Sequence, residues 1–171
     1  MAGAPVEYIK SITRQYAELG YKPYGWFYNT DVPPWQPLRK PLKQSRVALI
    51  ASGGIYRHGQ TAFHSKDDTS LRLIPTNVRT EDLRTSHFAY DQTDARKDPN
   101  VVFPIDTLRG LVREGFIGGL TEHAFTFMGG IYSSRRVREE VAPAITERLV
   151  AGRADSRCWC LFDPCVISPL D

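Results

Sequence analysis

The sequence predicts an α/β protein with a three-layer domain around a mostly parallel sheet, preceded by a Pro- and aromatic-rich N-terminal arm. Three observations predict this fold: an apolar run at 46–50 that ends in glycines, two later segments with helical spacing, and short apolar runs between them. The 171 residues are 42% hydrophobic and 24% charged, which is typical of globular proteins. We therefore expect a helix and arm over 1–45 and one α/β domain over 46–171.

The N-terminal part combines a helical pattern with a dense run of prolines. Apolar residues recur at helical spacing from Val6 to Leu19, and Gly20 follows where a helix would end. Prolines are frequent over 21–41, where they prevent regular strands, so we expect an extended arm with aromatic anchors at Tyr24, Trp26, Phe27 and Trp35. Two interpretations stay open: the arm packs on the domain itself, or it docks on a partner subunit.

Alternating strands and helices are expected over the rest of the chain. The run 46–50 predicts a buried strand, and the turn at Ser52, Gly53 and Gly54 would let the backbone approach a ligand closely. Further strands are expected at 71–75 and 101–104. Helices are expected at 107–114, with Asp106 as N-cap, and at 135–150, where Pro143 should cause a kink or a break.

Charge and hydropathy point away from two classes of partner. The net charge is only +3, and the Arg and Lys residues are dispersed, so we expect no nucleic-acid partner. No apolar run approaches the roughly 20 residues that span a bilayer, and the N-terminus shows no signal-peptide pattern. We therefore expect no membrane partner and a cytoplasmic location.

The three cysteines lie together near the end of the chain, at Cys158, Cys160 and Cys165. In a reducing compartment such a cluster is more often redox-active, catalytic or metal-binding than a structural disulfide framework. Structural zinc spacing needs a second matching pair, which is absent from the sequence, so no metal is expected. A redox role is attractive because thiols beyond a strand end lie where α/β domains bind ligands. Three incidental thiols are the alternative.

Histidine offers a second source of chemistry. His87 and Asp91 lie close in sequence, so Asp91 could orient His87 as a general acid or base. A structural histidine satisfied by a backbone carbonyl is the equal alternative. His58 and His64 fall in a polar loop, where they face solvent or the mouth of a site, and His123 has no evident partner in the sequence.

Several motifs occur in an order that resembles a known family. They are Val-Ala-Leu-Ile-Ala-Ser-Gly-Gly-Ile-Tyr at 47–56, Ser-His at 86–87 with Asp91, Asp-Pro-Asn-Val-Val-Phe-Pro-Ile-Asp-Thr-Leu-Arg at 98–109, Glu-Gly-Phe-Ile-Gly at 114–118, and Phe-Met-Gly at 127–129. Together, over about 46–154, they resemble the selenoprotein B family of glycine, sarcosine, betaine and D-proline reductases, in a short form.

The resemblance implies an oxidoreductase that cleaves a carbon–nitrogen bond. In such complexes a pyruvoyl group on a partner subunit forms an imine with the substrate amine, a selenolate attacks the α-carbon, and a thiol resolves the adduct. The expected partners are other reductase subunits, a small amine or amino-acid substrate and a thiol reductant such as a thioredoxin-like protein. The expected site residues are Cys165, Cys160 and His87 for catalysis, and Ser52, Gly53, Gly54, Tyr56, Asp91 and Asp106 for substrate binding.

The tail departs from the family pattern, which reads Val-Pro-Val-Sec-Pro-x-Cys-His-Gln after an apolar strand. This chain reads Arg-Cys-Trp-Cys-Leu-Phe-Asp-Pro-Cys over 157–165. One choice of synonymous codons for 157–171, read from the third base of the Arg157 codon, gives Val-Leu-Val-Pro-Val-stop-Pro-Val-Cys-His-Gln. Any codons for Cys158, Trp159 and Cys160 give Leu then Val, and the Phe162–Asp163 junction must give TGA or CGA.

TGA is the selenocysteine codon, so we expect 157–171 to be a shifted-frame tail with a selenocysteine near Phe162 and Asp163. No other cofactor is expected on this chain. As written, the chain lacks the selenium nucleophile, and Cys165 or Cys160 would have to substitute for it. Two alternatives remain: a non-catalytic docking subunit, and a general thiol or peroxide reductase. The substrate cannot be read from these residues.

Overall fold

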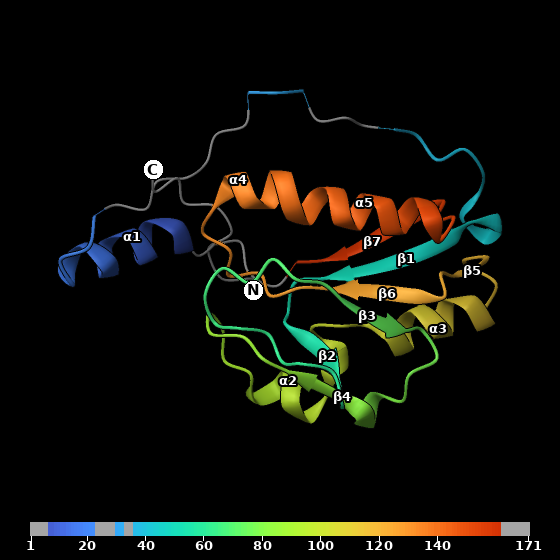
Figure 1. The fold of residues 1–171 in the computed structure, drawn as a ribbon, viewed down its shortest axis with the longest axis horizontal. Helices are drawn as coiled ribbons and strands as arrows, with labels where there is room; N and C mark the ends of the chain where they lie inside the picture. Colours follow the sequence, from blue (N-terminus) through green and yellow to red (C-terminus); the bar gives the residue numbers. More distant parts are fainter. Residues whose placement is uncertain (1–6, 23–29, 33–35, 162–171) are drawn as a thin grey trace, which may run out of the picture.

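The computed structural model describes residues 7–22, 30–32 and 36–161. Its centre is strand β1 (Arg46–Ala51), which pairs in parallel with β7 (Ser156–Cys160) on one side. On the other side β1 pairs in parallel with β5 (Gly119–Leu120) and then β6 (His123–Thr126). Strand β3 (Arg72–Pro75) pairs antiparallel with β6, so the sheet is mostly parallel (Figure 1).

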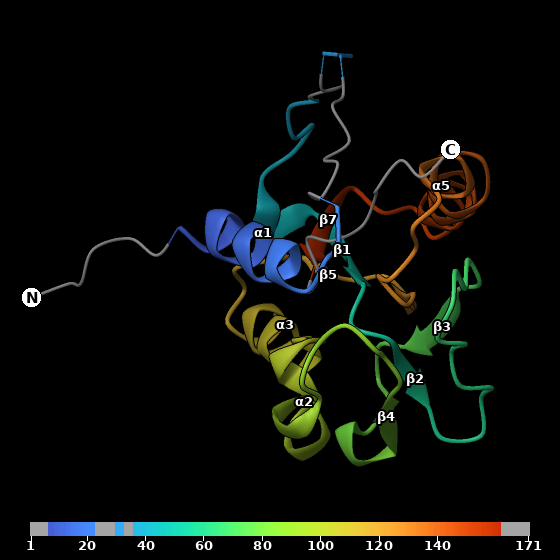
Figure 2. The ribbon, with the colours of Figure 1, turned by 90° about the vertical axis from the view of Figure 1, so that its left-hand side faces the viewer.

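Helices cover both faces of this sheet, so the three-layer prediction is confirmed. Side chains of a strand alternate between faces, and Leu49 packs in one core cluster with residues of α3 (Ile105–Arg113). Ile50 packs in the other cluster with Ile145 of α5 (Ala142–Ala151). Figure 2 shows α5 on one side of the sheet, and α3 and α2 (Thr93–Lys97) on the other.

The helix expected over 135–150 is interrupted, as Pro143 predicted. It begins as α4 (Ser134–Arg136), widens into the π-helix η4 (Val137–Val141) and continues as α5. Pro143 lies in the first turn of α5, where the missing N–H of proline is least harmful. The first expected helix is present as α1 (Tyr8–Glu18), and Gly20 follows with a φ of 82°.

The strand predicted at 101–104 is wrong, although its residues are buried. Pro99–Val101 instead form the 3-10 helix η3, because the Asp98 side chain accepts a hydrogen bond from the backbone N–H of Asn100. Val102 and Phe103 then enter the core fully buried. An apolar run therefore supplied core residues without joining the sheet.

The remaining elements are short, and two of them form a separate two-stranded sheet. Strands β2 (Ile55–Arg57) and β4 (Leu83–Thr85) pair antiparallel. Short 3-10 helices lie at η1 (Leu42–Gln44) and η2 (Thr80–Asp82). Tyr24, Trp26, Phe27 and Trp35, the expected anchors of the arm, lie outside the described residues. Among the described helices, none is long and apolar enough to cross a membrane.

Candidate functional site

Three segments meet where β1, β6 and β7 end, at the carboxyl edge of the parallel strands. The backbone N–H of Ser52, just after β1, donates to the Cys160 carbonyl at the end of β7 over 3.1 Å. The N–H of Gly54 donates to the Phe127 carbonyl, and the N–H of Gly129 donates to the Ser52 carbonyl, which joins the loop after β6. Ligands of parallel α/β sheets bind at this edge, so it is the candidate site.

Glycines allow these loops to approach so closely. Gly54 has a φ of 68°, and a Cβ there would fall on the carbonyl oxygen of Ser86. A Cβ on Gly130 would fall within the Phe88 ring. The turn after β1 and the loop after β6 are therefore each pressed against the segment 85–90, which follows β4.

Tyr90 ties this segment to the turn. Its hydroxyl donates to the Gly53 carbonyl over 2.7 Å, and the Thr85 hydroxyl donates to the same oxygen over 3.2 Å. The two hydroxyls also lie 3.0 Å apart, within hydrogen-bond distance. Burial is the main cause that raises the pKa of Tyr90, so the phenol stays protonated and serves as a donor.

His87 lies buried beside Tyr90, with the two ring centroids 4.7 Å apart. Its Nδ1 accepts the backbone N–H of Ala89 over 3.0 Å, and its carbonyl accepts a hydrogen bond from Gln92. The carboxylate of Asp91 instead accepts the hydroxyl and the N–H of Thr93, and the hydroxyl bond is the main cause that lowers the pKa of Asp91. Asp91 therefore does not orient His87 as expected. The backbone N–H of Ala89 holds the Nδ1 atom of His87 instead.

The described thiols are poorly suited to nucleophilic attack. Cys158 and Cys160 are half-buried on the face of β7 that packs against the α3 cluster. Burial raises the pKa of both thiols, and the neighbouring Cys158 raises that of Cys160 further. A thiol with a raised pKa carries little thiolate at neutral pH. Cys165 lies outside the described residues.

Two of the residues expected to bind substrate, Tyr56 and Asp106, make structural contacts. Tyr56 is a half-buried residue of β2, paired with Arg84 of β4. Asp106 lies in the first turn of α3, so its prediction as the N-cap is wrong: the helix begins at Ile105, after Pro104. Its carboxylate accepts hydrogen bonds from Asn100 and from Arg109 over 3.0 and 2.6 Å. Because Arg109 also donates to the Thr76 and Val78 carbonyls, Asp106 holds α3 against the segment after β3. Their roles in substrate binding stay predictions.

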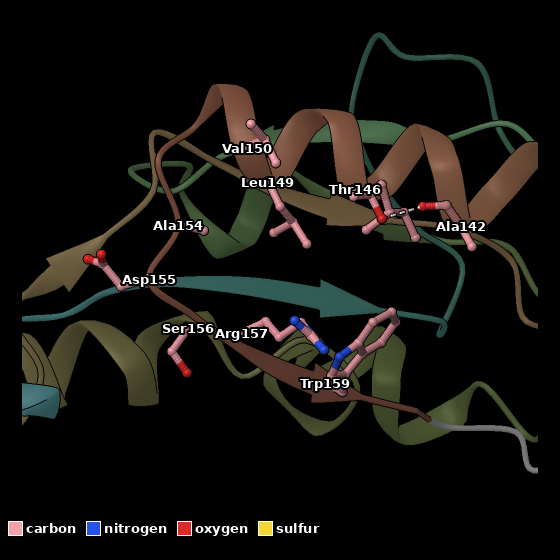
Figure 3. Close-up of a pocket in the computed structure, with 10 residues that line it drawn as sticks. Ala142, Thr146, Leu149, Val150, Ala154, Asp155, Ser156, Arg157 and Trp159 are labelled. Atoms are coloured by element: carbon pink, nitrogen blue, oxygen red, sulfur yellow. Dashed lines mark hydrogen bonds between the residues drawn. The ribbon is translucent and has the colours of Figure 1, made fainter. Parts of the chain in front are cut away.

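Two open cavities lie away from this edge. One, of about 330 Å³, lies between the apolar side of α5 and the outer face of β7, where Leu149, Arg157 and Trp159 line it (Figure 3). The other, of about 460 Å³, lies where β1 and β5 begin, near an ion pair of 2.7 Å between Lys40 and Asp155. We favour the carboxyl edge as the site because the polar groups of three loops converge there.

No group of three or more His, Cys, Asp or Glu side chains within residues 7–22, 30–32 and 36–161 could hold a metal ion.

Sequence reasoning placed the turn and His87 at the site but missed Tyr90 and Thr85. Thr85 lies just before His87 and Tyr90 just after it. The high density of hydroxyl and aromatic residues over 85–90 is the feature of the sequence that could have indicated them. The aromatic neighbours Phe88 and Tyr132, whose ring centroids are 6.2 Å apart, were also missed. They come from separate loops, and their spacing in sequence does not reveal that they meet.

Comparison with known proteins identifies the family. A family model described as glycine/sarcosine/betaine reductase selenoprotein B matches residues 24–157. The chain is 38% identical over 120 residues, or 70% of its length, to D-proline reductase subunit gamma of Acetoanaerobium sticklandii, and covers 50% of that protein. It is 33% identical over 103 residues, or 57% of its length, to sarcosine reductase complex component B subunit beta of Peptoclostridium acidaminophilum, and covers 23% of it.

A third relative, glycine reductase complex component B subunit gamma of Symbiobacterium thermophilum, is 32% identical over 119 residues. The alignment covers 65% of this chain and 28% of that relative. The chain thus spans about half the length of the first relative and about a quarter of the other two. No solved structure matches it. With a family match that extends over most of the sheet and both helical layers, the chain belongs to the glycine/sarcosine/betaine reductase selenoprotein B family.

Proposed function

We propose that this chain is the nucleophile-bearing component of a reductase that cleaves a carbon–nitrogen bond of an amino acid or a related amine. The supporting observation is the contact between Ser52 N–H and the Cys160 carbonyl, because it brings the end of β7 to the turn at the carboxyl edge. Strand β7 therefore ends beside the turn that Tyr90 contacts through the Gly53 carbonyl. The relatives are named as subunits of D-proline, sarcosine and glycine reductases, so other subunits are the expected partners.

The nucleophile in this proposal is a selenocysteine encoded in the shifted frame near Phe162 and Asp163. Two observations favour that frame. The family match ends at Arg157, the residue at which the frames diverge. Strand β7 also carries Arg157 and Trp159, both exposed, on the side toward α5, whereas the strands of a parallel sheet with helices on both faces are normally apolar throughout (Figure 3). The shifted reading supplies Val, Leu and Val there.

The chain's own residues would prepare this edge for chemistry. The Ser52–Gly54 turn is buried and its backbone hydrogen bonds hold the three loops together, so we propose that the substrate binds beside this turn. We assign His87 to proton transfer as a general acid or base. Cleaving the bond reductively consumes two electrons, for which we propose a thiol reductant of the thioredoxin-like type in the cytoplasm. A pyruvoyl group on a partner subunit would supply an electrophilic carbon, and no residue of this chain is assigned to it.

The nucleotide sequence of the gene tests the first part of the proposal, the selenocysteine in the shifted frame. Its nucleotides across codons 157–171 should contain TGA at the Phe162–Asp163 junction in the shifted frame. The second part is tested with the shifted-frame chain, produced with selenocysteine and, as the matched control, with serine at that position. The selenocysteine form should release ammonia or a reductively opened amine with its partner subunits and a dithiol, and the serine form should not. A gene with CGA at the junction rules out the selenocysteine.

A non-catalytic docking subunit is the second candidate, favoured by the raised pKa of Cys158 and Cys160 in the chain as written. In that case deletion of residues 21–41 should abolish assembly with the other subunits. If assembly survives the deletion and the shifted-frame chain turns over substrate, the docking-only function is wrong.

A further inference from the structure

Four aromatic rings form a continuous strip from the buried side of the candidate site to the surface. We call Tyr90, His87, Phe88 and Tyr132 the aromatic strip. Successive ring centroids are 4.7, 5.8 and 6.2 Å apart. His87 is buried and Tyr90 half-buried, while Phe88 and Tyr132 are 43% and 42% exposed. The strip therefore leads outward from the carboxyl edge and ends in two accessible rings.

The backbone holds the exposed end of the strip in place. Gly130 lies directly under Phe88, and any side chain at 130 would occupy the space of that ring. Phe88 also stacks on His87 at an interplanar angle of 18°, and the His87 ring is held by the N–H of Ala89. Because the two exposed rings are neighbours, they form a small contiguous apolar surface, and we consider it as a binding surface.

Charge near Tyr132 favours a cationic ligand. The carboxylate of Asp67 accepts the backbone N–H of Tyr132 over 2.7 Å, so a negative charge lies at the exposed end of the strip. Arg136 contacts the same loop through the Asp67 carbonyl, but its guanidinium is paired with Glu140 over 3.0 Å. Aromatic ring faces attract cations within about 6 Å of the ring centroid. A cation that lies over both rings can meet that distance to each of them, because the Phe88 and Tyr132 centroids are only 6.2 Å apart.

We propose that Phe88 and Tyr132 form an organic-ammonium binding site at the entrance to the carboxyl edge. The site would receive the positively charged nitrogen of an amine before it reaches the turn. This inference rests on the proposed function for its place in a reaction, but its binding chemistry is independent of turnover.

The test is a titration of the full ¹⁵N-labelled chain with tetramethylammonium chloride, followed by amide NMR shifts at constant ionic strength. tert-Butanol, a neutral molecule of similar size, is the control probe. The ammonium should shift the amides of Phe88, Gly130 and Tyr132, and tert-butanol should not. Phe88→Leu and Tyr132→Leu should each weaken binding about two- to fivefold, the factor expected for a lost cation–π contact at an exposed site. Tyr132→Phe keeps the ring and should bind normally.

Phe116→Leu is the matched control variant, because Phe116 is an aromatic residue of 59% exposure that lies after α3. It should not change the affinity. An equal response to both probes would show a merely apolar patch, and affinity that survives both Leu variants would also overturn the proposal. A folded Tyr132→Phe variant that fails to bind would do the same. The titration needs neither selenium nor a partner subunit, so the two proposals can fail separately. If the reductase is active but the chain does not bind tetramethylammonium, the ammonium site is rejected and the proposed function stands. If the chain binds tetramethylammonium but shows no turnover, the proposed function is rejected and the ammonium site stands.

Discussion

Single residues at the carboxyl edge set how closely its loops can pack. Gly54 and Gly59 both have positive φ, at 68° and 90°. They differ in their surroundings, because a Cβ on Gly54 would meet the Ser86 carbonyl, whereas nothing lies within 4 Å of a Cβ on Gly59. The pair separates the cost of a left-handed backbone from the cost of a steric clash.

We expect Gly59→Ala to lower the free energy of unfolding by about 1 to 2 kcal/mol, the cost of a left-handed non-glycine residue. Gly54→Ala should lower it by at least about 1 kcal/mol more, because the backbone of 52–54 or 86 must move. Urea denaturation of the two variants measures the difference. Equal losses would show that the turn and the segment after β4 are not in firm contact.

Thiol ionisation is a second property of single residues. Because burial raises the pKa of Cys158 and Cys160, both thiols stay protonated at pH values where an ordinary thiol is partly ionised. Their alkylation by iodoacetamide at pH 8 should therefore be slower in the native chain than in urea, and the native rate should rise at higher pH. A native rate at pH 8 equal to the rate in urea would contradict the burial.

At the scale of elements, one ion-pair network fastens a loop to a helix. Arg136 of α4 binds both carboxylate oxygens of Glu140 over 3.0 Å, and it donates to the Asp67 carbonyl and the Thr69 hydroxyl. Thr69 also donates to Glu140 over 2.6 Å. The neighbouring pair Arg135–Glu139, at 2.8 Å, has the same i,i+4 spacing and lies on an exposed surface, so it serves as a control.

Glu140→Gln should loosen the loop at 64–70, and Glu139→Gln should leave it unchanged. Hydrogen exchange of the loop amides measures this. The Arg136 hydrogen bonds, with help from Thr69, lower the pKa of Glu140 from 4.5 to about 2. A lowered folded-state pKa means that the stabilisation is present above pH 4.5 and is lost as the pH falls toward about 2. Exchange that is already fast at pH 4 would contradict the network.

The elements also show what could be predicted from the sequence. The strand at 46–50 and the break at Pro143 were predictable, because local apolar pattern and proline geometry decide them. The run 101–104 misled because the Asp98 cap wins over a local apolar pattern. At the site, the glycine turn was visible in the sequence, but Tyr90 was not, since its partner Gly53 lies 37 residues away. Long-range hydrogen bonds of that kind leave no periodic signal.

At the scale of the whole molecule, the two edges of the sheet differ. The β3 edge is covered, because Gln60 donates to the Leu73 carbonyl over 3.0 Å and Arg72 donates to the Thr61 carbonyl over 2.8 Å. Among the described residues, β7 pairs with β1 alone, and Trp159 in this strand is 45% exposed. An exposed edge strand of this kind favours addition of another strand.

We therefore expect the chain as written to self-associate through β7 as its concentration rises. Trp159→Lys should shift it toward the monomer, because charge on an edge strand opposes pairing. Phe116→Lys, which places the same charge far from β7, should have no effect. Sedimentation velocity over a range of concentrations measures both, and a monomer at every concentration would show that the β7 edge is already blocked.

The pairing of β7 with β1 has a consequence for the gene itself. Its five registered pairs, from Val47 with Ser156 to Ala51 with Cys160, are made by peptide groups that every residue except proline provides. A frame shift at codon 157 would therefore keep the first pairs of the strand and alter only the side chains there, whereas the Pro that the shifted reading places near the end of β7 cannot donate to the pairing. The residues beyond would change completely, and under the proposed function they would include the selenocysteine. Under that proposal the reading frame alone decides whether the chain carries its nucleophile.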